Sequence, residues 1–375
     1  MEFFKTHVAM EKKICSVETA TWISFIYFPT LSTDHPLMIT IGRRFFSRSA
    51  LSGKQITIAY NNVHVVKNIQ DREYDLLCKT VDYQRSDIKK TDLKKFKEAF
   101  GDDYHQTFTF VRNTDRLVAT NTHIVFHPFR HNEGWENLVF RGKLWISPDV
   151  HGSQILSITA DQSYDAGFSV GNHSMGFVTN KSYKTMKAYK HMFGSTDMLQ
   201  KYYVSHYDFG DLCMPKNLNT DGIFIKNARD VPDKDIVDYD SKIFQYERSK
   251  YVLGQLREDF GRVAYNDHGE VVGFGAVSVY PSGECTITPM YADDTQIART
   301  ILKSILEEMS LDPEKYWRLK LHSHDHTPES YGWIRPFVKT MTHRTEICTL
   351  MCDHKEDGMD FKKVFSMFHP STCPI

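Results

Sequence analysis

Residues 144–156 spell LWISPDVHGSQIL and place a strand, a turn and the start of a helix in one short stretch. The apolar residues 144–146 favour a buried strand, and the Ser-Pro-Asp at 147–149 favours a turn. Residues 151–154 then lead into a predicted helix. The first backbone N–H groups of a helix have no partner within it, and the helix dipole favours negative charge there. The stretch therefore predicts an anion-binding loop.

The length and composition of the chain indicate a globular protein. Its 375 residues correspond to about two domains of about 150 residues each. A hydrophobic fraction of 41% and a charged fraction of 25% are ordinary values. The net charge of −1 gives no sign of nucleic-acid binding, and the basic residues 89–97 are best explained as one solvated helix face. We therefore expect neither nucleic acid nor a membrane surface as a partner.

The cysteines and the N-terminal region favour a cytoplasmic location. The seven cysteines are scattered and odd in number, which favours a reducing compartment over a disulfide framework. The apolar run at 21–31 is too short for a bilayer, which takes about 20 residues. It begins late for a signal peptide and has acidic residues before it. We interpret it as a buried strand, with an uncleaved targeting segment as the alternative.

Apolar patterning predicts the same order of elements, β-α-α-β-β-β-α-β-α-β, in each half of the chain. In the first half we predict strands at 56–68, 106–112, 115–126, 137–146, 167–171 and 199–206, with helices at 71–83, 91–100 (Thr91 as its N-cap), 153–164 and 180–193. In the second half we predict strands at 222–226, 262–266, 270–280, 284–289, 317–322 and 344–352, with helices at 232–244, 246–258, 295–309 and 328–338. The implied domains are an extension at 1–55, a first domain at 56–207, a linker at 208–220, a second domain at 221–355 and a C-terminal tail at 356–375.

This element order resembles the GNAT (N-acetyltransferase) superfamily. The resemblance implies an α/β fold with a mixed sheet (α+β), present as two tandem GNAT-like acyl-CoA N-acyltransferase folds. In that fold the fourth and fifth strands splay apart, acyl-CoA occupies the splay, and its pyrophosphate lies at the N-terminus of the following helix. Acetyl-CoA would then be the acyl donor and an amine the acceptor.

The second half resembles the C-terminal domain of two-domain GNAT acyltransferases in particular. Four short motifs carry this resemblance: Tyr239-Asp240 with Ile243-Phe244, Arg248-Ser249 with Tyr251-Val252, Gly273-Phe274-Gly275, and ITPMYADDTQIARTIL at 287–302. In the motif at 287–302, the family pattern is matched by Pro289, Ala292, Asp293 and Ala298, whereas Thr288 replaces a usual glycine.

The first half resembles the general GNAT pattern, whose phosphate loop is Gln/Arg-x-x-Gly-x-Gly/Ala. In this register His151 takes the Gln/Arg place, Gln154 takes the first glycine place, and Gly152 sits where many members carry glycine. Farther on, Tyr189 and Gly194 match a helix whose tyrosine protonates the leaving CoA thiolate in family members that use it. The resemblance thus implies Tyr189 as the catalytic acid, and as cofactor-binding residues it implies Ile146, His151, Gly152, Ser153 and Gln154.

Two other classes of function stay open. Both loops depart from the glycine pattern, so the alternative to an enzyme is a catalytically inactive GNAT-like protein that binds acyl-CoA or serves as an interaction scaffold. The run His322-Ser-His324-Asp325-His326 is similar to metallohydrolase motifs but lacks a spacer residue, so a polar strand-end loop without metal is favoured. Cys348 and Cys352 share one strand face and are more typical of packing. For the general base, Glu136 and Glu284 are candidates because each precedes or begins a fourth strand.

Overall fold

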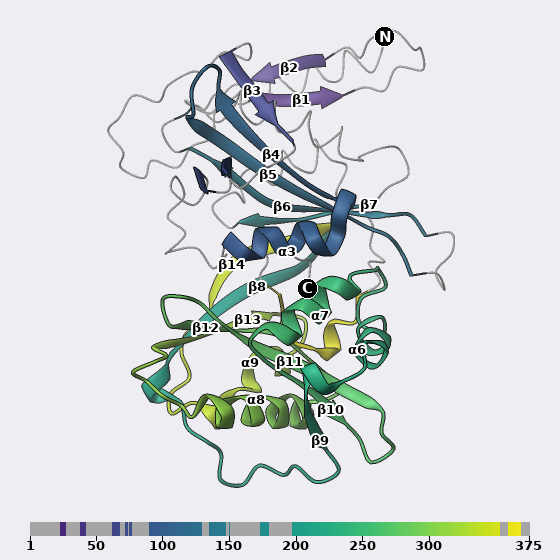
Figure 1. Cartoon of the computed structure of the whole chain (residues 1–375), viewed down its shortest axis with the longest axis vertical. Helices are drawn as coiled ribbons and strands as arrows, with labels where there is room; N and C mark the ends of the chain where they lie inside the picture. Colours follow the sequence, from purple (N-terminus) through teal and green to yellow (C-terminus); the bar gives the residue numbers. More distant parts are fainter. Residues whose placement is uncertain are drawn as a thin grey trace, which may run out of the picture.

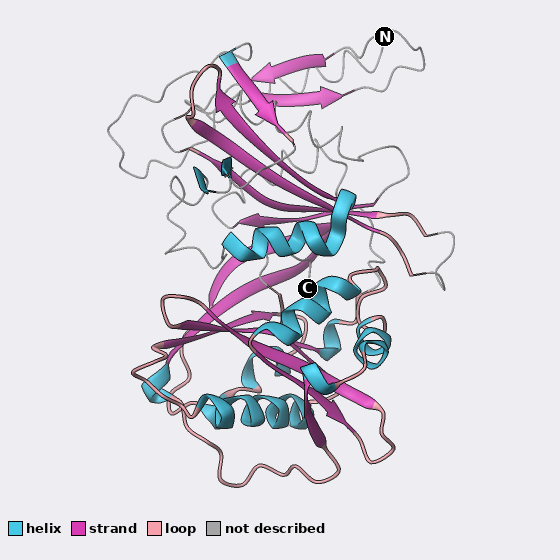
Figure 2. Ribbon diagram, viewed as in Figure 1, coloured by secondary structure: helices cyan, strands magenta, loops and turns pink. Residues whose placement is uncertain are grey.

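The computed structural model describes residues 23–27, 38–42, 62–67, 72–73, 75–76, 90–129, 135–147, 150, 173–179, 197–352 and 359–368. Strands dominate these residues, and most of them belong to one large mixed sheet (Figure 2). Within the described residues, no helix is long and apolar enough to cross a membrane.

A separate two-stranded antiparallel sheet lies in the predicted N-terminal extension. It consists of β1 (Ile23–Tyr27) and β2 (Met38–Gly42). The strand predicted within residues 21–31 is therefore confirmed as a strand. Nothing further of the predicted extension lies within the described residues.

The first half follows the predicted order where it is described, except that strand β7 lies at residues 173–179, where no strand was predicted. Its elements are β3 (Val63–Val66), α3 (Lys90–Phe100), a 3-10 turn at Gly101–Asp103, β4 (Tyr104–Val111), β5 (Leu117–Phe126), β6 (Leu138–Ile146), β7 (His173–Thr179) and β8 (Asp197–Asp208). Helix α3 begins one residue earlier than predicted, so Thr91 lies inside the helix and the prediction of Thr91 as N-cap is wrong. Of the predicted helix at 71–83, residues 72–73 and 75–76 are helical, whereas the predicted elements at 153–164, 167–171 and 180–193 lie outside the described residues.

The second half contains every predicted element. These are β9 (Phe224–Asn227), α6 (Asp233–Asp240), α7 (Ser249–Glu258), β10 (Phe260–Tyr265), β11 (Val271–Val279), β12 (Glu284–Ala292), α8 (Thr295–Met309), β13 (Arg318–His324), α9 (Glu329–Gly332) and β14 (Thr345–Cys352). Helix α8 has the predicted bounds because Asp294 caps it, its carboxylate accepting a hydrogen bond from the Ile297 N–H at 2.8 Å. At its other end Ser310 turns the chain with a left-handed φ of 58°.

The two halves share one sheet, in which the last predicted strand of the second half has an unexpected place. The strand order is β3-β4-β5-β6-β7-β14-β8-β13-β12-β11-β10-β9. Strand β14 is antiparallel to both β7 and β8, so it completes the first half of the sheet instead of closing the second. The long strand β8 pairs with β14 along one edge and with β13 along the other, and it runs from one half to the other (Figure 1).

Part of the predicted C-terminal tail is also ordered. Residues 359–368, here called the C-terminal segment, include a 3-10 turn (Phe361–Lys363) and β15 (Val364–Ser366), which pairs with β12. The predicted linker is packed as well: Phe209 and Leu212 are buried in the core beside α8.

The sheet is covered on both faces in the second half. Helices α6 and α7 cover one face, where Val263 and Phe274 are buried, and α8 covers the other, where Ala264 and Val277 are buried. The core under α6 and α7 continues into the first half, since α3 packs on α7 and Phe96 stacks on Tyr251 with ring centroids 5.0 Å apart. A single apolar core therefore joins the two halves.

Candidate functional site

Strands β6 and β7 part from each other in the middle of the first half. They are parallel and paired from Leu138↔His173 to Arg141↔Gly176. Beyond that point β6 pairs with β5, and β7 pairs with β14. We call the diverging ends of these strands the first splay. The described residues include no strand that pairs with β6 and β7 inside it.

The end of β6 is built as the sequence predicts. Ile146 is its last residue and lies opposite Ala119 of β5. The next residue, Ser147, donates its N–H to the Val118 carbonyl at 2.8 Å, and Val150 is buried against the same strand. The other predicted site residues, His151, Gly152, Ser153, Gln154 and Tyr189, lie outside the described residues, so their roles stay predictions.

A row of basic side chains that sequence reasoning missed lies beside the first splay. His105, His123 and Arg141 are opposite one another on β4, β5 and β6, so they project from one face of the sheet. Burial, and after it the positive charge of Arg141, lowers the pKa of His123 to about 3. The pKa of His105 is also lowered by burial. Both shifts favour the neutral imidazole.

More polar side chains adjoin this row. Thr107 lies opposite Asn121, whose amide is 3.4 Å from His123 Nε2. The hydroxyls of Thr107 and Thr109 are buried without a hydrogen-bond partner in the described part of the chain. A signal was present in the sequence, because residues 120–123, TNTH, are four consecutive polar residues inside a predicted strand. Buried polar groups without partners carry a cost, so this face is not explained by packing alone.

Strands β12 and β13 part in the same way in the second half. They are parallel and paired from Glu284↔Arg318 to Ile287↔Leu321. Beyond Ile287, β12 pairs with β11 on one side and with β15 on the other. We call the diverging ends of β12 and β13 the second splay. It contains a strand of the chain itself, whereas no described strand lies in the first splay.

The histidine run of residues 322–326 lies at the end of β13, which extends two residues beyond the predicted strand, so the predicted strand-end loop is confirmed for residues 325–326 and wrong for residues 323–324. His322 and His324 belong to the strand and are buried. His324 Nε2 donates to the Val364 carbonyl at 2.7 Å, and its Nδ1 accepts the His326 N–H at 3.1 Å. Both ring nitrogens of His324 are thus engaged within the protein. Among the described residues, no group of three or more His, Cys, Asp or Glu is arranged to hold a metal ion.

Neither candidate for the general base lies where strands part. Glu136 is exposed and precedes β6 at its paired end. At about 3.3 Å per residue it is roughly 16 Å from Arg141, where the strands diverge. Glu284 is at the paired end of β12, and its carboxylate binds Lys320 at 2.8 Å. The positions of both residues are therefore unsuited to a base in either splay.

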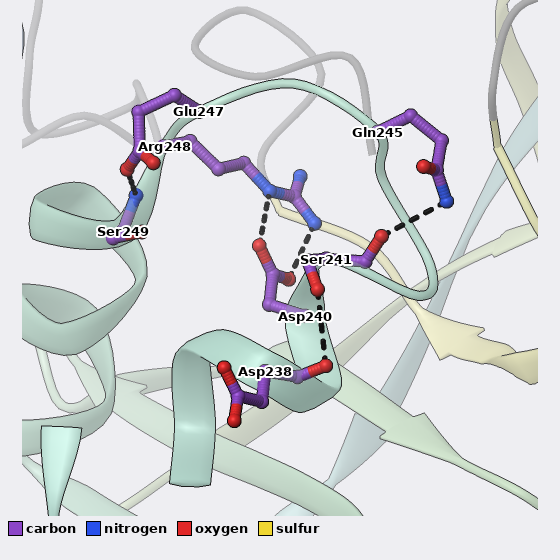
Figure 3. A network of polar contacts seen from close by, with 7 residues as sticks. All are labelled: Asp238, Asp240, Ser241, Gln245, Glu247, Arg248 and Ser249. Carbon is purple, nitrogen blue, oxygen red and sulfur yellow. Dashed lines mark hydrogen bonds and ion pairs between the residues drawn. The ribbon is translucent and has the colours of Figure 1, made fainter. Parts of the chain in front are cut away.

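The residues that carry the second-half resemblance form buried structure. Arg248 donates two hydrogen bonds to Asp240, at 3.0 and 2.8 Å, and the polar contacts around this pair join α6 to α7 (Figure 3). The Arg248 side chain is 0% exposed and that of Asp240 is 2% exposed. The guanidinium also lies over the rings of Phe244 and Phe368, with centroid distances of 4.4 and 5.3 Å. This motif therefore maintains the core and contacts the C-terminal segment.

Comparison of the sequence with family models gives one match. Residues 60–243 match a family described as "Protein of unknown function (DUF1248)". The search of curated proteins finds no match.

Comparison with solved structures identifies the fold. A putative acetyltransferase from Pyrococcus horikoshii is 12% identical with a TM-score of 0.60, covering 87% of this chain and 100% of its own. A tandem GNAT protein from the clavulanic acid biosynthesis pathway is 10% identical with a TM-score of 0.54, covering 79% and 100%. Saccharomyces cerevisiae N-myristoyltransferase with bound myristoyl-CoA is 8% identical with a TM-score of 0.55, covering 97% and 99%. The chain has the GNAT fold, in two tandem domains. The predicted fold class is thereby confirmed, and the first and second splays are the diverging strands of these two domains.

Proposed function

We propose that the chain is an acyl-CoA-dependent N-acyltransferase that transfers an acetyl group from acetyl-CoA to an amine. The observation that carries this proposal is the first splay, in a chain with the GNAT fold. Structural neighbours include a protein described as an acetyltransferase and one described with bound myristoyl-CoA, which supports a CoA-type donor. The donor would lie in the first domain, because the second splay already contains β15.

The proposed chemistry is acyl transfer between two bound substrates. The neutral amine attacks the thioester carbonyl carbon and forms a C–N bond, and a backbone N–H of β6 stabilises the oxyanion that develops. The C–S bond then breaks, and Tyr189 donates its phenol proton to the departing thiolate. The proton lost from the ammonium passes to a base or an ordered water. Holding both substrates in reactive geometry supplies much of the rate.

The proposed binding residues follow from the loop after β6. Ile146 ends the strand, and His151, Gly152, Ser153 and Gln154 would bind the pyrophosphate at the start of the next helix. The second candidate function is an inactive acyl-CoA-binding or interaction scaffold. It is favoured by the loop sequence, in which Gly152 is the single glycine of residues 151–154.

Thermal unfolding with acetyl-CoA tests both functions. A ligand at 100 times its Kd stabilises the native state by about 2.7 kcal/mol, so we expect the melting temperature to rise. Thiol release in the presence of an amine panel then separates the enzyme from the scaffold. A shift without thiol release would favour an inactive acyl-CoA-binding protein, and the absence of any shift at saturating acetyl-CoA would exclude both the enzyme and acyl-CoA binding.

A substitution at the predicted acid tests the mechanism. We expect Tyr189→Phe to lower kcat by about 100-fold or more with little change in acetyl-CoA affinity, as for the loss of a general acid. Tyr183→Phe, on the same predicted helix, is the matched control and should keep its activity. Equal activity of the two variants would exclude Tyr189 as the acid.

A further inference from the structure

The C-terminal segment occupies the second splay with both of its backbone edges. On one edge β15 is antiparallel to β12, with Met290 opposite Ser366 and Tyr291 opposite Val364. On the other edge the Met367 N–H donates to the His322 carbonyl of β13 at 3.2 Å. The hydrogen-bonding groups that the diverging strands would otherwise leave open are thus used by the chain itself.

Side chains around the splay hold the same segment. The Ser366 hydroxyl donates to the carbonyl of Ile287, the last residue of β12 that pairs with β13, at 2.7 Å. The Trp333 indole donates to the Phe365 carbonyl at 3.0 Å, and the His324 ring donates to the Val364 carbonyl. Residues 364–368 are all buried. The segment therefore has the burial and hydrogen bonding of a well-fitted ligand.

The N-terminus of α8 also has its hydrogen-bonding and charged partners within the chain. Asp294 caps the helix, and Asp293 stands beside it. Lys363 of the C-terminal segment binds the Asp293 carboxylate at 2.8 Å, and the Tyr239 hydroxyl donates to the same carboxylate at 3.0 Å. Two carboxylates at this helix end would repel a pyrophosphate. The second domain thus supplies anionic side chains, and its own lysine, at the position where the fold otherwise binds a phosphate group.

We propose that the C-terminal segment is a built-in occupant of the second splay, so that each chain binds one acyl-CoA, in the first domain. The single-donor part rests on the function proposed above, whereas the occupancy part does not. In the same C-terminal region, β14 inserts beside β7 in the first domain and β15 fills the second. In this proposal the splay of the second domain is closed by β15, and the second half of the chain completes the sheet of the first domain with β14.

Hydrogen exchange of the full chain, with and without acetyl-CoA, tests the occupancy. We expect the amides of Val364, Ser366 and Met367 to exchange as slowly as the β11 core and to be unchanged by acetyl-CoA. Rapid exchange in the free protein would overturn the proposal, and so would a change in these amides when acetyl-CoA is added. Calorimetric titration should give one acetyl-CoA per chain, and two per chain would also overturn it. Absence of binding would remove the proposed function and the single-donor part, while the exchange rates would still decide occupancy.

A charge reversal provides matched variants. Lys363→Glu removes the ion pair with Asp293, and we expect exchange of the three amides to accelerate by about threefold, as for the loss of a partly exposed ion pair. Lys362→Glu changes an exposed neighbour and should leave exchange unchanged. Combining Lys363→Glu with Asp293→Lys should restore slow exchange. Equal effects of the Lys362 and Lys363 substitutions would contradict the proposed anchor.

Discussion

The two splays of this molecule have the same strand geometry and different contents. In each, a parallel pair of strands separates after four paired positions, at Arg141 and Gly176 in the first domain and at Ile287 and Leu321 in the second. Only the second is filled by a described strand, β15. Separated strands expose backbone N–H and C=O groups that must find partners. The difference teaches that the chain itself can satisfy this slot in one domain, whereas in the proposed function a ligand satisfies it in the other.

The two domains also differ in the polarity of the sheet face that is turned away from the shared core. In the second domain this face is apolar, with Ala264, Val277 and Ile287 packed beneath α8. In the first domain the central strands place His123 and Thr107 on this face. A face selected only for packing is expected to be apolar, because buried polar groups cost free energy when they lack partners. The polar first domain and the apolar second domain fit a division between binding and support.

Among the predicted effects on stability, the loss of the buried Arg248–Asp240 ion pair should be the largest. Arg248→Ala leaves Asp240 charged, buried and unpaired, and it removes the cation from the ring of Phe368 in the C-terminal segment. We expect the free energy of unfolding to fall by about 4 kcal/mol, the usual range for one partner of a buried pair. Urea denaturation measures this loss, and faster exchange of the Val364 amide would show that the second splay has loosened.

The control for this variant is an exposed ion pair on the same helix layer. Lys234→Ala removes a pair with Asp238 that is largely exposed, so its effect on stability should be close to zero. If Arg248→Ala cost no more than Lys234→Ala, the buried pair would not support the filled splay.

The sequence predicted the order of elements well, because that order depends on local patterns. Helix α8 has the predicted bounds since its cap and its apolar stripe are local features. The partners of β14 were missed because an alternating run predicts a strand without identifying its neighbours. Strand β15 was missed because three residues carry too little periodic signal. Of the predicted site, the end of β6 at Ile146 is confirmed as a strand end, whereas the polar row at His123 becomes visible only when three strands are aligned.

Acidification should weaken the filled splay through His324. Burial lowers the pKa of this imidazole to about 4, and its Nδ1 must stay unprotonated to accept the His326 N–H. In the unfolded chain a histidine binds a proton near pH 6.5, so between pH 6.5 and 4 the unfolded state binds more protons than the folded state. The contribution of His324 is complete above pH 6.5 and is lost as the pH falls to about 4, amounting to about 3 kcal/mol.

Comparing two variants isolates this effect. Urea denaturation at pH 7 and pH 4.5 should show that His324→Gln has a smaller loss of stability on acidification than the unmodified protein. His268→Gln, in the exposed hairpin between β10 and β11, should follow the unmodified protein. Identical acid profiles for the three proteins would show that His324 does not link pH to the second splay.

Raising the pH should weaken a different set of contacts, those of the His127 ring with Asp103 and Asn137 in the first domain. The His127 carbonyl accepts the Glu247 N–H at 2.7 Å, and its ring nitrogens lie 3.0 Å from the Asp103 and Asn137 side-chain oxygens. Burial lowers the pKa of His127, but the hydrogen bonds to Asp103 and Asn137 outweigh burial and raise it. This contribution is therefore present below pH 6.5 and is lost as the pH rises through the raised pKa. Because the side chain is about half exposed, solvent screening limits it to a few tenths of a kcal/mol. The difference in stability between His127→Gln and the unmodified protein should shrink from pH 6 to pH 8.5, whereas the difference for His324→Gln should move in the opposite direction and level off once the unfolded-state histidine has lost its proton. A constant His127 difference would mean that this part of the first domain, unlike the second splay, has no histidine-linked response to pH.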